Sequence, residues 1–376
     1  ELMHELQNWL ATLTGLDTVS LAPAAGAQGE LAGMLTIKKA LENRGESHRK
    51  IVLIPDSAHG TNPATAAMCG FDIKVIPSNK EGLVDFELFE KLVKEHKDQI
   101  AGTMITNPNT CGKFEINIKK ISDLIHDAGG YFYCDGANYN AIVGKIKPAD
   151  IGVDVMHFNL HKTFSTPHGG GGPGSGPIAV CKELAEFIPS PHVVKEGDKF
   201  KFAEPKNTSG KIKGFNGQFG MHVRALTYML SHGSDGLQKV SEDAVLSANY
   251  ILSKLKKYYH TPVGDKCMHE CLLTDKFQKE DGVSTMDVAK ALVEYGFHPM
   301  TVFFPTIFQG TMLIEPTETE SKQTIDNFID TMVYIATEIK EKRGERFANF
   351  PLSTPRKRLD EVKAAKNPVI TWLETN

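Results

Sequence analysis

The chain has 376 residues, of which 41% are hydrophobic and 23% are charged, a composition that excludes intrinsically disordered and collagen-like proteins. The length suits a large α/β domain with a smaller appended unit. Because 42 Lys and Arg residues nearly balance 46 Asp and Glu residues, no global charge favours nucleic acid or an anionic membrane, and any anionic ligand must be held locally.

The cysteine pattern and the hydropathy predict the cellular compartment of the protein. Six cysteines without a C-x-x-C pair predict neither a zinc ribbon nor a disulfide framework, which favours a reducing compartment. No apolar run approaches the roughly 18 residues of a membrane span, and the first residues lack the order of a signal peptide. We expect a soluble protein with no membrane contact, located in the cytoplasm, or in the mitochondrial matrix if the source is a eukaryote.

The first half of the chain predicts an α/β sheet. Apolar residues spaced by about 3.6 make residues 1–15 helical, and since the chain opens on Glu1 we expect a preceding segment. A Gly/Ala-rich loop at 24–30 leads into a helix that ends near residue 43. Short apolar runs then alternate with helical stretches at 85–95 and 116–128, which indicates a mostly parallel sheet with helices on both faces. The runs are residues 51–54, 73–77, 103–106, 131–134, 155–159 and 177–181.

The second half predicts a smaller α+β unit. The polar, Lys-rich stretch 191–213 is typical of an excursion from the domain or of a mobile loop, and helices follow at 220–230 and 243–259. From residue 267 we expect strands at 269–274, 301–304 and 312–315, helices at 285–295 and 322–342, and a basic amphipathic end at 356–376. The predicted domains are an N-terminal segment (1–20), a large domain (21–260) and a small domain with its tail (261–376).

The stretch NLHKTFSTPHGGGGPGSG, residues 159–176, carries the most specific chemical signal. It is not a Walker phosphate loop, because Lys162 precedes the glycines instead of following them. A lysine amine at a strand end can attack a carbonyl carbon and form a Schiff base. For a lone lysine, an exposed residue before a flexible loop is the more common explanation.

Asp135 strengthens the Schiff-base interpretation of Lys162. It ends the predicted strand one strand-and-connection unit upstream, where a fixed carboxylate can keep the pyridine nitrogen of pyridoxal phosphate (PLP) protonated. Ala137 leaves room for the flat ring. The alternative for Asp135 alone is a turn or a helix N-cap.

Other strand ends offer further candidate groups. Gly26, Ala27 and Gln28 begin a helix whose free N–H groups can hold a phosphate. The loop TNPNTCG at 106–112 places Asn109 and Thr110 where a side chain can bind the phenolic oxygen of the cofactor, although it is also a good turn sequence. The histidine candidates are His59, which can stack on the ring or be purely structural, and His161 and His168, which can transfer protons.

Six motifs together resemble the glycine decarboxylase family, the P-proteins of the glycine cleavage system, which have the fold of type-I PLP enzymes. The resemblance covers essentially the whole chain. The motifs are AAGAQGE (24–30), AHGTNPAT (58–65), TNPNTCG (106–112), DGANYN (135–140), NLHKTFSTPHGGGGPGSG (159–176) and IEPTETES (314–321).

The resemblance implies decarboxylation of glycine and transfer of its aminomethyl group to the lipoyl arm of the H-protein, with release of CO2. It implies PLP bound covalently to Lys162, Asp135 at the ring nitrogen, and His59 stacked on the ring. The family contains a catalytically silent half that lacks the lysine, so this chain corresponds to subunit 2 or to a C-terminal half, with a lysine-lacking subunit 1 as its partner.

Two other classes of function stay open from the sequence. Another type-I PLP enzyme, an aminotransferase or amino-acid lyase, would share Lys162 and Asp135, and Arg224 could bind the substrate carboxylate of an aminotransferase. A non-catalytic scaffolding half is the second alternative, against which the presence of Lys162 argues.

Overall fold

The computed structural model describes residues 1–166 and 172–372. A seven-stranded sheet forms its larger part, with the strand order β1-β7-β6-β5-β4-β2-β3. Neighbouring strands from β3 through β6 are parallel, whereas β7 pairs antiparallel with both β6 and β1. The strands are β1 (Thr18–Ser20), β2 (Ile51–Pro55), β3 (Asp72–Ile76), β4 (Ile100–Thr106), β5 (Tyr131–Gly136), β6 (Val155–Phe158) and β7 (Ile178–Val180).

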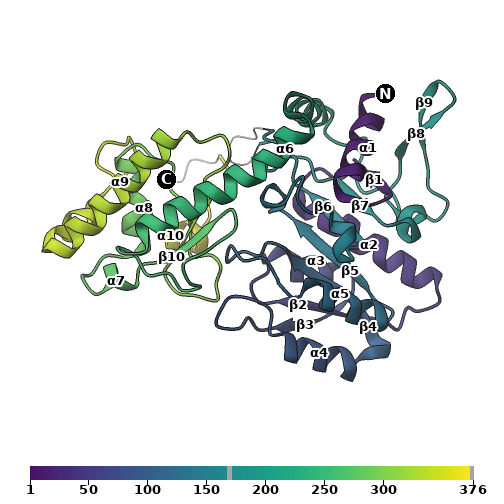
Figure 1. Cartoon of the computed structure of the whole chain (residues 1–376), viewed down its shortest axis with the longest axis horizontal. Coiled ribbons are helices and arrows are strands. Elements are labelled where there is room, and N and C mark those ends of the chain that lie inside the picture. Colours follow the sequence, from purple (N-terminus) through teal and green to yellow (C-terminus); the bar gives the residue numbers. More distant parts are fainter. Residues whose placement is uncertain (167–171, 373–376) are drawn as a thin grey trace.

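Helices cover both faces of this sheet (Figure 1). On β5, Phe132 and Cys134 belong to one hydrophobic core, and Tyr131 and Tyr133 belong to the other. This alternation follows from the period of two along a strand, and it confirms the predicted mostly parallel sheet between two helical layers. The first core is shared with α1 (Leu2–Thr14), α4 (Phe86–Glu95) and α5 (Ile118–Asp127), and the second with α2 (Gly26–Asn43) and α3 (Thr61–Met68).

A smaller C-terminal unit is joined to the sheet domain by the long helix α6 (Phe219–Leu255) (Figure 1). Its antiparallel sheet has the order β10-β12-β11 and shares a separate core with its helices. Ser284 and Asp287 form a capping box at the start of α8. The elements are β10 (Cys271–Thr274), α7 (Lys276–Lys279), α8 (Thr285–Glu294), β11 (Thr301–Val302), β12 (Thr311–Ile314), α9 (Lys322–Glu338) and α10 (Glu361–Lys366).

The structure corrects two predictions from the sequence. The stretch 191–213, predicted as an excursion or a mobile loop, contains a hairpin of β8 (His192–Glu196) and β9 (Lys199–Ala203). The alternating Lys and Phe residues of β9 give a strand period. The two helices predicted at 220–230 and 243–259 are segments of α6, which bends at Gly233 with φ of 62°. In addition, β1 pairs with β7, so residues 18–20 belong to the large sheet.

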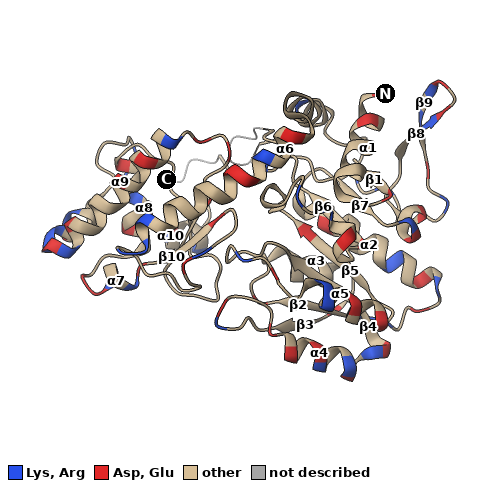
Figure 2. Ribbon diagram, in the orientation of Figure 1, with Lys and Arg blue, Asp and Glu red and all other residues tan. Residues whose placement is uncertain are grey.

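Charged residues of both signs are mixed over the surface. Figure 2 shows Lys, Arg, Asp and Glu interspersed along α4 and α9. None of the helices in the described ranges is both long and apolar enough to cross a membrane.

Candidate active site

Asp135 lies at the carboxyl end of β5, where the strand register gathers polar side chains. Asp135 is opposite Thr106 of β4 on one side and His157 of β6 on the other. It is 2% exposed. Ligands of open α/β sheets bind at this edge, because the strands end there and the connecting loops leave a crevice.

Several groups hold the carboxylate of Asp135 in one orientation. Asn62 donates from Nδ2 to Oδ2 at 2.9 Å, and the backbone N–H of Ala137 donates to Oδ1 at 2.9 Å. His157 Nε2 lies 3.5 Å from Oδ1. Burial acts to raise the pKa of Asp135, but His157, the hydrogen bonds from Asn62 and Ala137, and the charge of Lys162 outweigh it and lower the pKa. Asp135 is therefore a fixed, ionised carboxylate.

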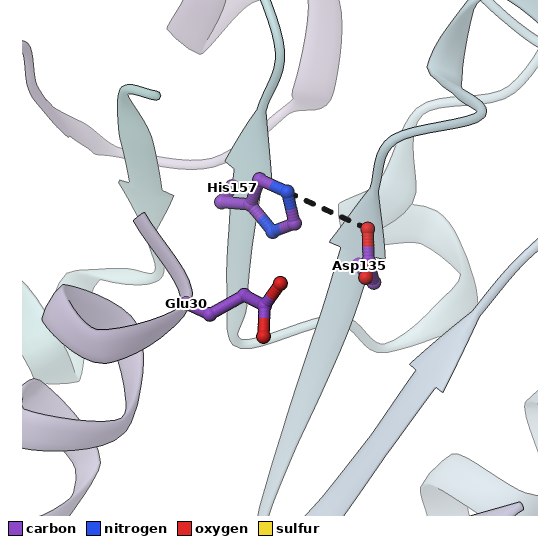
Figure 3. A group of neighbouring side chains, drawn as sticks. All are labelled: Glu30, Asp135 and His157. Atoms are coloured by element: carbon purple, nitrogen blue, oxygen red, sulfur yellow. Dashed lines mark ion pairs between the residues drawn. The ribbon is translucent and has the colours of Figure 1, made fainter. Parts of the chain in front are cut away.

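His157 on β6 and Glu30 on α2 lie near this carboxylate (Figure 3). Burial lowers the pKa of His157 against the opposing charge of Asp135, and its Nδ1 lies 2.6 Å from the Tyr133 hydroxyl. Burial and the charge of Asp135 raise the pKa of Glu30 to about 7. Thr61 Oγ1 donates to Glu30 Oε1 at 2.7 Å. The sheet edge thus holds one ionised carboxylate beside a second that is partly protonated at neutral pH.

Lys162 and Asp135 both line a cavity of about 590 Å³. The lysine follows β6 in a turn in which its N–H donates to the Asn159 carbonyl at 2.9 Å. Its charge acts on Asp135 and His157 from the sheet and on Glu270 from the smaller unit, so its amine lies among these groups. Other lining residues are Gly26, Ala27, His59, Thr106, Thr110, Ala137, Asn138, His161, Thr301, Phe304 and Glu315.

The start of α2 forms a tightly packed cradle at one side of the cavity. A Cβ on Gly26 would lie 2.4 Å from Asn159 Oδ1, and a Cβ on Gly176 would lie 2.0 Å from the Ala25 carbonyl oxygen. No side chain caps this helix, whose first intrahelical bond in the described structure is from the N–H of Gly29 to Ala25. Free N–H groups at a helix start are suited to an anion such as phosphate. The Gln28 side chain is occupied elsewhere, accepting from Ala24 N–H at 2.7 Å, so only its backbone is available.

Most residues predicted from the sequence line the cavity, but Gln28 and Asn109 do not. Asn109 Nδ2 donates to the Gly82 carbonyl at 2.7 Å, and its Oδ1 accepts from the backbone N–H of Cys111 at 2.9 Å. The Asn109 side chain therefore holds its own loop, and its contact with the phenolic oxygen stays a prediction. The next residue, Thr110, is the one that lines the cavity.

The predicted histidines have separate surroundings. His59 lines the cavity, with Nδ1 2.8 Å from Thr61 Oγ1 and its ring 5.7 Å from that of Phe304. His161 also lines the cavity, and its Nδ1 accepts from the backbone N–H of Ser175 at 3.2 Å. His168 lies outside the described residues.

Sequence reasoning missed several groups at this site. Asn62 and His157 contact Asp135 directly, and Glu30 lies beside it. His157 is on β6, the strand that precedes Lys162. Pairing the two predicted strands in register would have placed His157 beside Asp135. Glu270 and Glu315 come from the smaller unit, and no local pattern relates them to Lys162.

Arg224, the candidate for binding a substrate carboxylate, is exposed on α6 and does not line the cavity. In the described part of the chain the cavity lining contains no arginine.

Comparisons with known proteins agree with this geometry. A family model described as "Glycine dehydrogenase, C-terminal domain" matches residues 240–350. A relative from Caulobacter vibrioides, named "Probable glycine dehydrogenase (decarboxylating) subunit 2", is 51% identical over 380 residues, covering 99% of this chain and 72% of the relative. A relative of the same name from Caldanaerobacter subterraneus is 52% identical over 373 residues, with coverage of 99% and 76%.

Solved structures share the fold. A glycine decarboxylase (P-protein) of the glycine cleavage system, in inhibitor-bound form, superposes with a TM-score of 0.74 at 20% identity, covering 88% of this chain and 74% of that one. A cysteine desulfurase from Thermococcus onnurineus gives a TM-score of 0.68 at 14% identity, covering 89% and 84%. At these identities the likeness establishes a common type-I PLP-enzyme fold.

Proposed function

Because the chain belongs to the family of glycine dehydrogenase (decarboxylating) subunit 2, we propose that it decarboxylates glycine with PLP held on Lys162. The aminomethyl group passes to the lipoyl arm of the H-protein, and CO2 is released. The name "subunit 2" implies a partner, subunit 1. We propose that this partner is the half of the enzyme that lacks the Schiff-base lysine. The observation that carries the proposal is the pairing of a fixed, ionised Asp135 with Lys162 in one cavity.

The cavity provides the groups that PLP needs. Lys162 supplies an amine for the aldehyde carbon, Asp135 supplies an anion for a protonated ring nitrogen, and the start of α2 supplies N–H donors for the phosphate. Thr106 Oγ1 is buried and has no hydrogen-bond partner in the described part of the chain, which leaves it available to a bound molecule. The residues present therefore fit the cofactor.

When bound, PLP supplies an electron sink for the electron pair left on the substrate carbon after CO2 departs. The protein keeps that sink effective by holding a proton at the ring nitrogen. The charge of Asp135 attracts this proton. Asn62 and Ala137 fix the carboxylate so that it need not reorient. His59, whose Nδ1 lies 2.8 Å from Thr61 Oγ1, would cover the ring. His161 lines the same cavity as Lys162 and would transfer protons there.

Trapping of PLP tests this proposal. The chain is incubated with PLP, alone and with subunit 1, then reduced with borohydride and mapped by peptide mass spectrometry. We expect a pyridoxyl group on Lys162, none in Lys162→Arg, and an unchanged yield in Lys182→Arg, which alters an exposed lysine. Exchange of the glycine carboxyl with labelled bicarbonate, measured with lipoylated H-protein, should fail in Lys162→Arg. An adduct on another lysine, or retained exchange, would refute the assignment, and a chain that takes up no PLP would support the scaffolding alternative.

A further inference from the structure

The smaller unit brings a second polar cluster to the wall of the cavity. Glu270 precedes β10 and Glu315 follows β12, and the antiparallel register that pairs Cys271 with Ile314 sets the two glutamates side by side. Both line the cavity that contains Lys162. His269 completes the cluster, with its Nε2 3.9 Å from Glu270 Oε1 and 3.8 Å from Glu315 Oε1.

Glu270 and His269 are deeply buried and poorly partnered. Glu270 is 5% exposed, and its carboxyl receives one long hydrogen bond of 3.4 Å from Asn138 Nδ2. His269 is 0% exposed, and neither ring nitrogen has a hydrogen-bond partner in the described part of the chain. By contrast, Glu315 is 41% exposed and accepts from Asn140 Nδ2 at 3.0 Å. The cluster therefore connects a buried carboxyl to solvent through Glu315.

The surroundings of Glu270 favour its protonated form. Burial and the charge of Glu315 raise its pKa well above the usual range, against the opposing effects of Lys162 and Asn138. Burial lowers the pKa of His269, which is therefore neutral near pH 7. Glu270 also acts on the thiols of Cys111, Cys267 and Cys271, and burial raises the pKa of each, so they are uncharged.

We propose that Glu270 is the acid that protonates the sulfur released when the lipoyl disulfide is opened in this cavity, an inference that rests on the proposed function. A bond forms between the aminomethyl carbon and one sulfur, the S–S bond breaks, and its electron pair moves to the second sulfur. That sulfur takes the proton of the Glu270 carboxyl. Glu270 then recovers a proton from solvent by way of Glu315. Lys162 and Asp135 are left to hold the cofactor.

The three donor atoms also lie within 4.8 Å of one another, a spacing that a divalent cation could use. The positive charge of Lys162 acts on both His269 and Glu270 and opposes a cation. We therefore favour the proton-bearing carboxyl, and Zn²⁺ titration separates the two interpretations.

The test uses the enzyme with subunit 1 and lipoylated H-protein, and compares Glu270→Gln with Glu280→Gln, an exposed glutamate of the same unit. Rapid quench measures aminomethyl transfer against pH, while borohydride trapping on Lys162 measures loading with PLP. We expect wild-type transfer to fall as pH rises through the pKa of Glu270. Glu270→Gln should transfer roughly 100-fold more slowly or worse, a loss typical of a missing general acid, with unchanged PLP trapping. Transfer by Glu270→Gln at the wild-type rate would overturn the proposal.

A spectroscopic measurement does not depend on turnover. Infrared difference spectra should show a protonated carboxyl band at neutral pH that disappears in Glu270→Gln. Glu315→Gln removes a like charge, so this band should titrate at a lower pH than in wild type. An unshifted band in Glu315→Gln, or tight Zn²⁺ binding that Glu270→Gln abolishes, would contradict the proposal. Absence of PLP trapping in the wild-type enzyme would instead refute the proposed function.

Discussion

Asn62, in the first turn of α3, donates from Nδ2 to Oδ2 of Asp135 at the end of β5, across 73 residues of sequence. Asn62 is fully buried, and its Oδ1 has no hydrogen-bond partner in the described part of the chain. The hydrogen bond fixes the rotamer of the carboxylate that we assign to the ring nitrogen. It also ties α3, and with it the His59 loop, to the central strand of the sheet.

Asn62→Leu is expected to weaken this arrangement without removing any charge. The variant leaves a buried carboxylate with one fewer donor, a loss of about 1–3 kcal/mol in the free energy of unfolding. Because the hydrogen bond lowers the pKa of Asp135, its removal should raise that pKa. Urea unfolding measures this loss of stability. Asn8→Ala, which changes an exposed residue of α1, is the control. An equal effect in both variants would show that the hydrogen bond contributes no special stability.

Asp135→Asn should separate cofactor attachment from catalysis. The amide is uncharged and cannot keep a proton on the ring nitrogen, so decarboxylation should slow by about 100-fold or more, the usual scale for a lost electrostatic contact. Trapping of PLP on Lys162 should persist. Asp150→Asn, an exposed position, is the control. Turnover at the wild-type rate in Asp135→Asn would remove this residue from the site.

Glu30 predicts a pH dependence of stability in the PLP-free chain. Its pKa is about 7 when folded and near 4.5 when unfolded, so the folded state binds more protons between these values. The contribution of Glu30 to the free energy of unfolding is therefore fully present below pH 4.5. It is lost as pH rises through 7, which lowers the free energy of unfolding by about 3 kcal/mol.

Glu30→Gln should remove this dependence, because the amide does not titrate. Relative to wild type, it should be more stable at pH 8 than at pH 5 in urea unfolding. Glu42→Gln, on the exposed side of the same helix, should follow the wild-type curve. If the wild type and Glu30→Gln keep a constant difference at both pH values, Glu30 does not titrate in this window.

Gly176→Ala should damage the phosphate cradle. The added methyl would lie 2.0 Å from the Ala25 carbonyl oxygen, so the start of α2 must move. Overpacking of this kind costs about 1–3 kcal/mol, and the displaced N–H groups should weaken PLP binding by roughly 10-fold or more. Gly214→Ala meets nothing within 4 Å and serves as the control. Equal PLP affinity in the two variants, measured by titration, would place the phosphate elsewhere.

The regular parts of the fold and the centre of the site could be read from local pattern. Apolar runs of strand length that alternate with amphipathic helices specify a parallel sheet, and such a sheet gathers its strand ends at one edge. Lys162 and Asp135 could therefore be assigned to one site. The hairpin at β8 and β9 escaped notice because its Lys-rich composition masked the period of two.

The sequence by itself determined which residues end the strands. Those strand ends in turn identified Lys162, Asp135 and the start of α2 as parts of one site. Only the tertiary structure decided that His157 lies beside Asp135, that Asn109 is held by its own loop, and that Glu270 comes from the smaller unit into the same cavity. The reason is physical. Periodicity and turn preference act between residues a few positions apart, whereas strand register, the docking of two cores and the burial that shifts a carboxyl pKa depend on contacts between residues far apart in the chain.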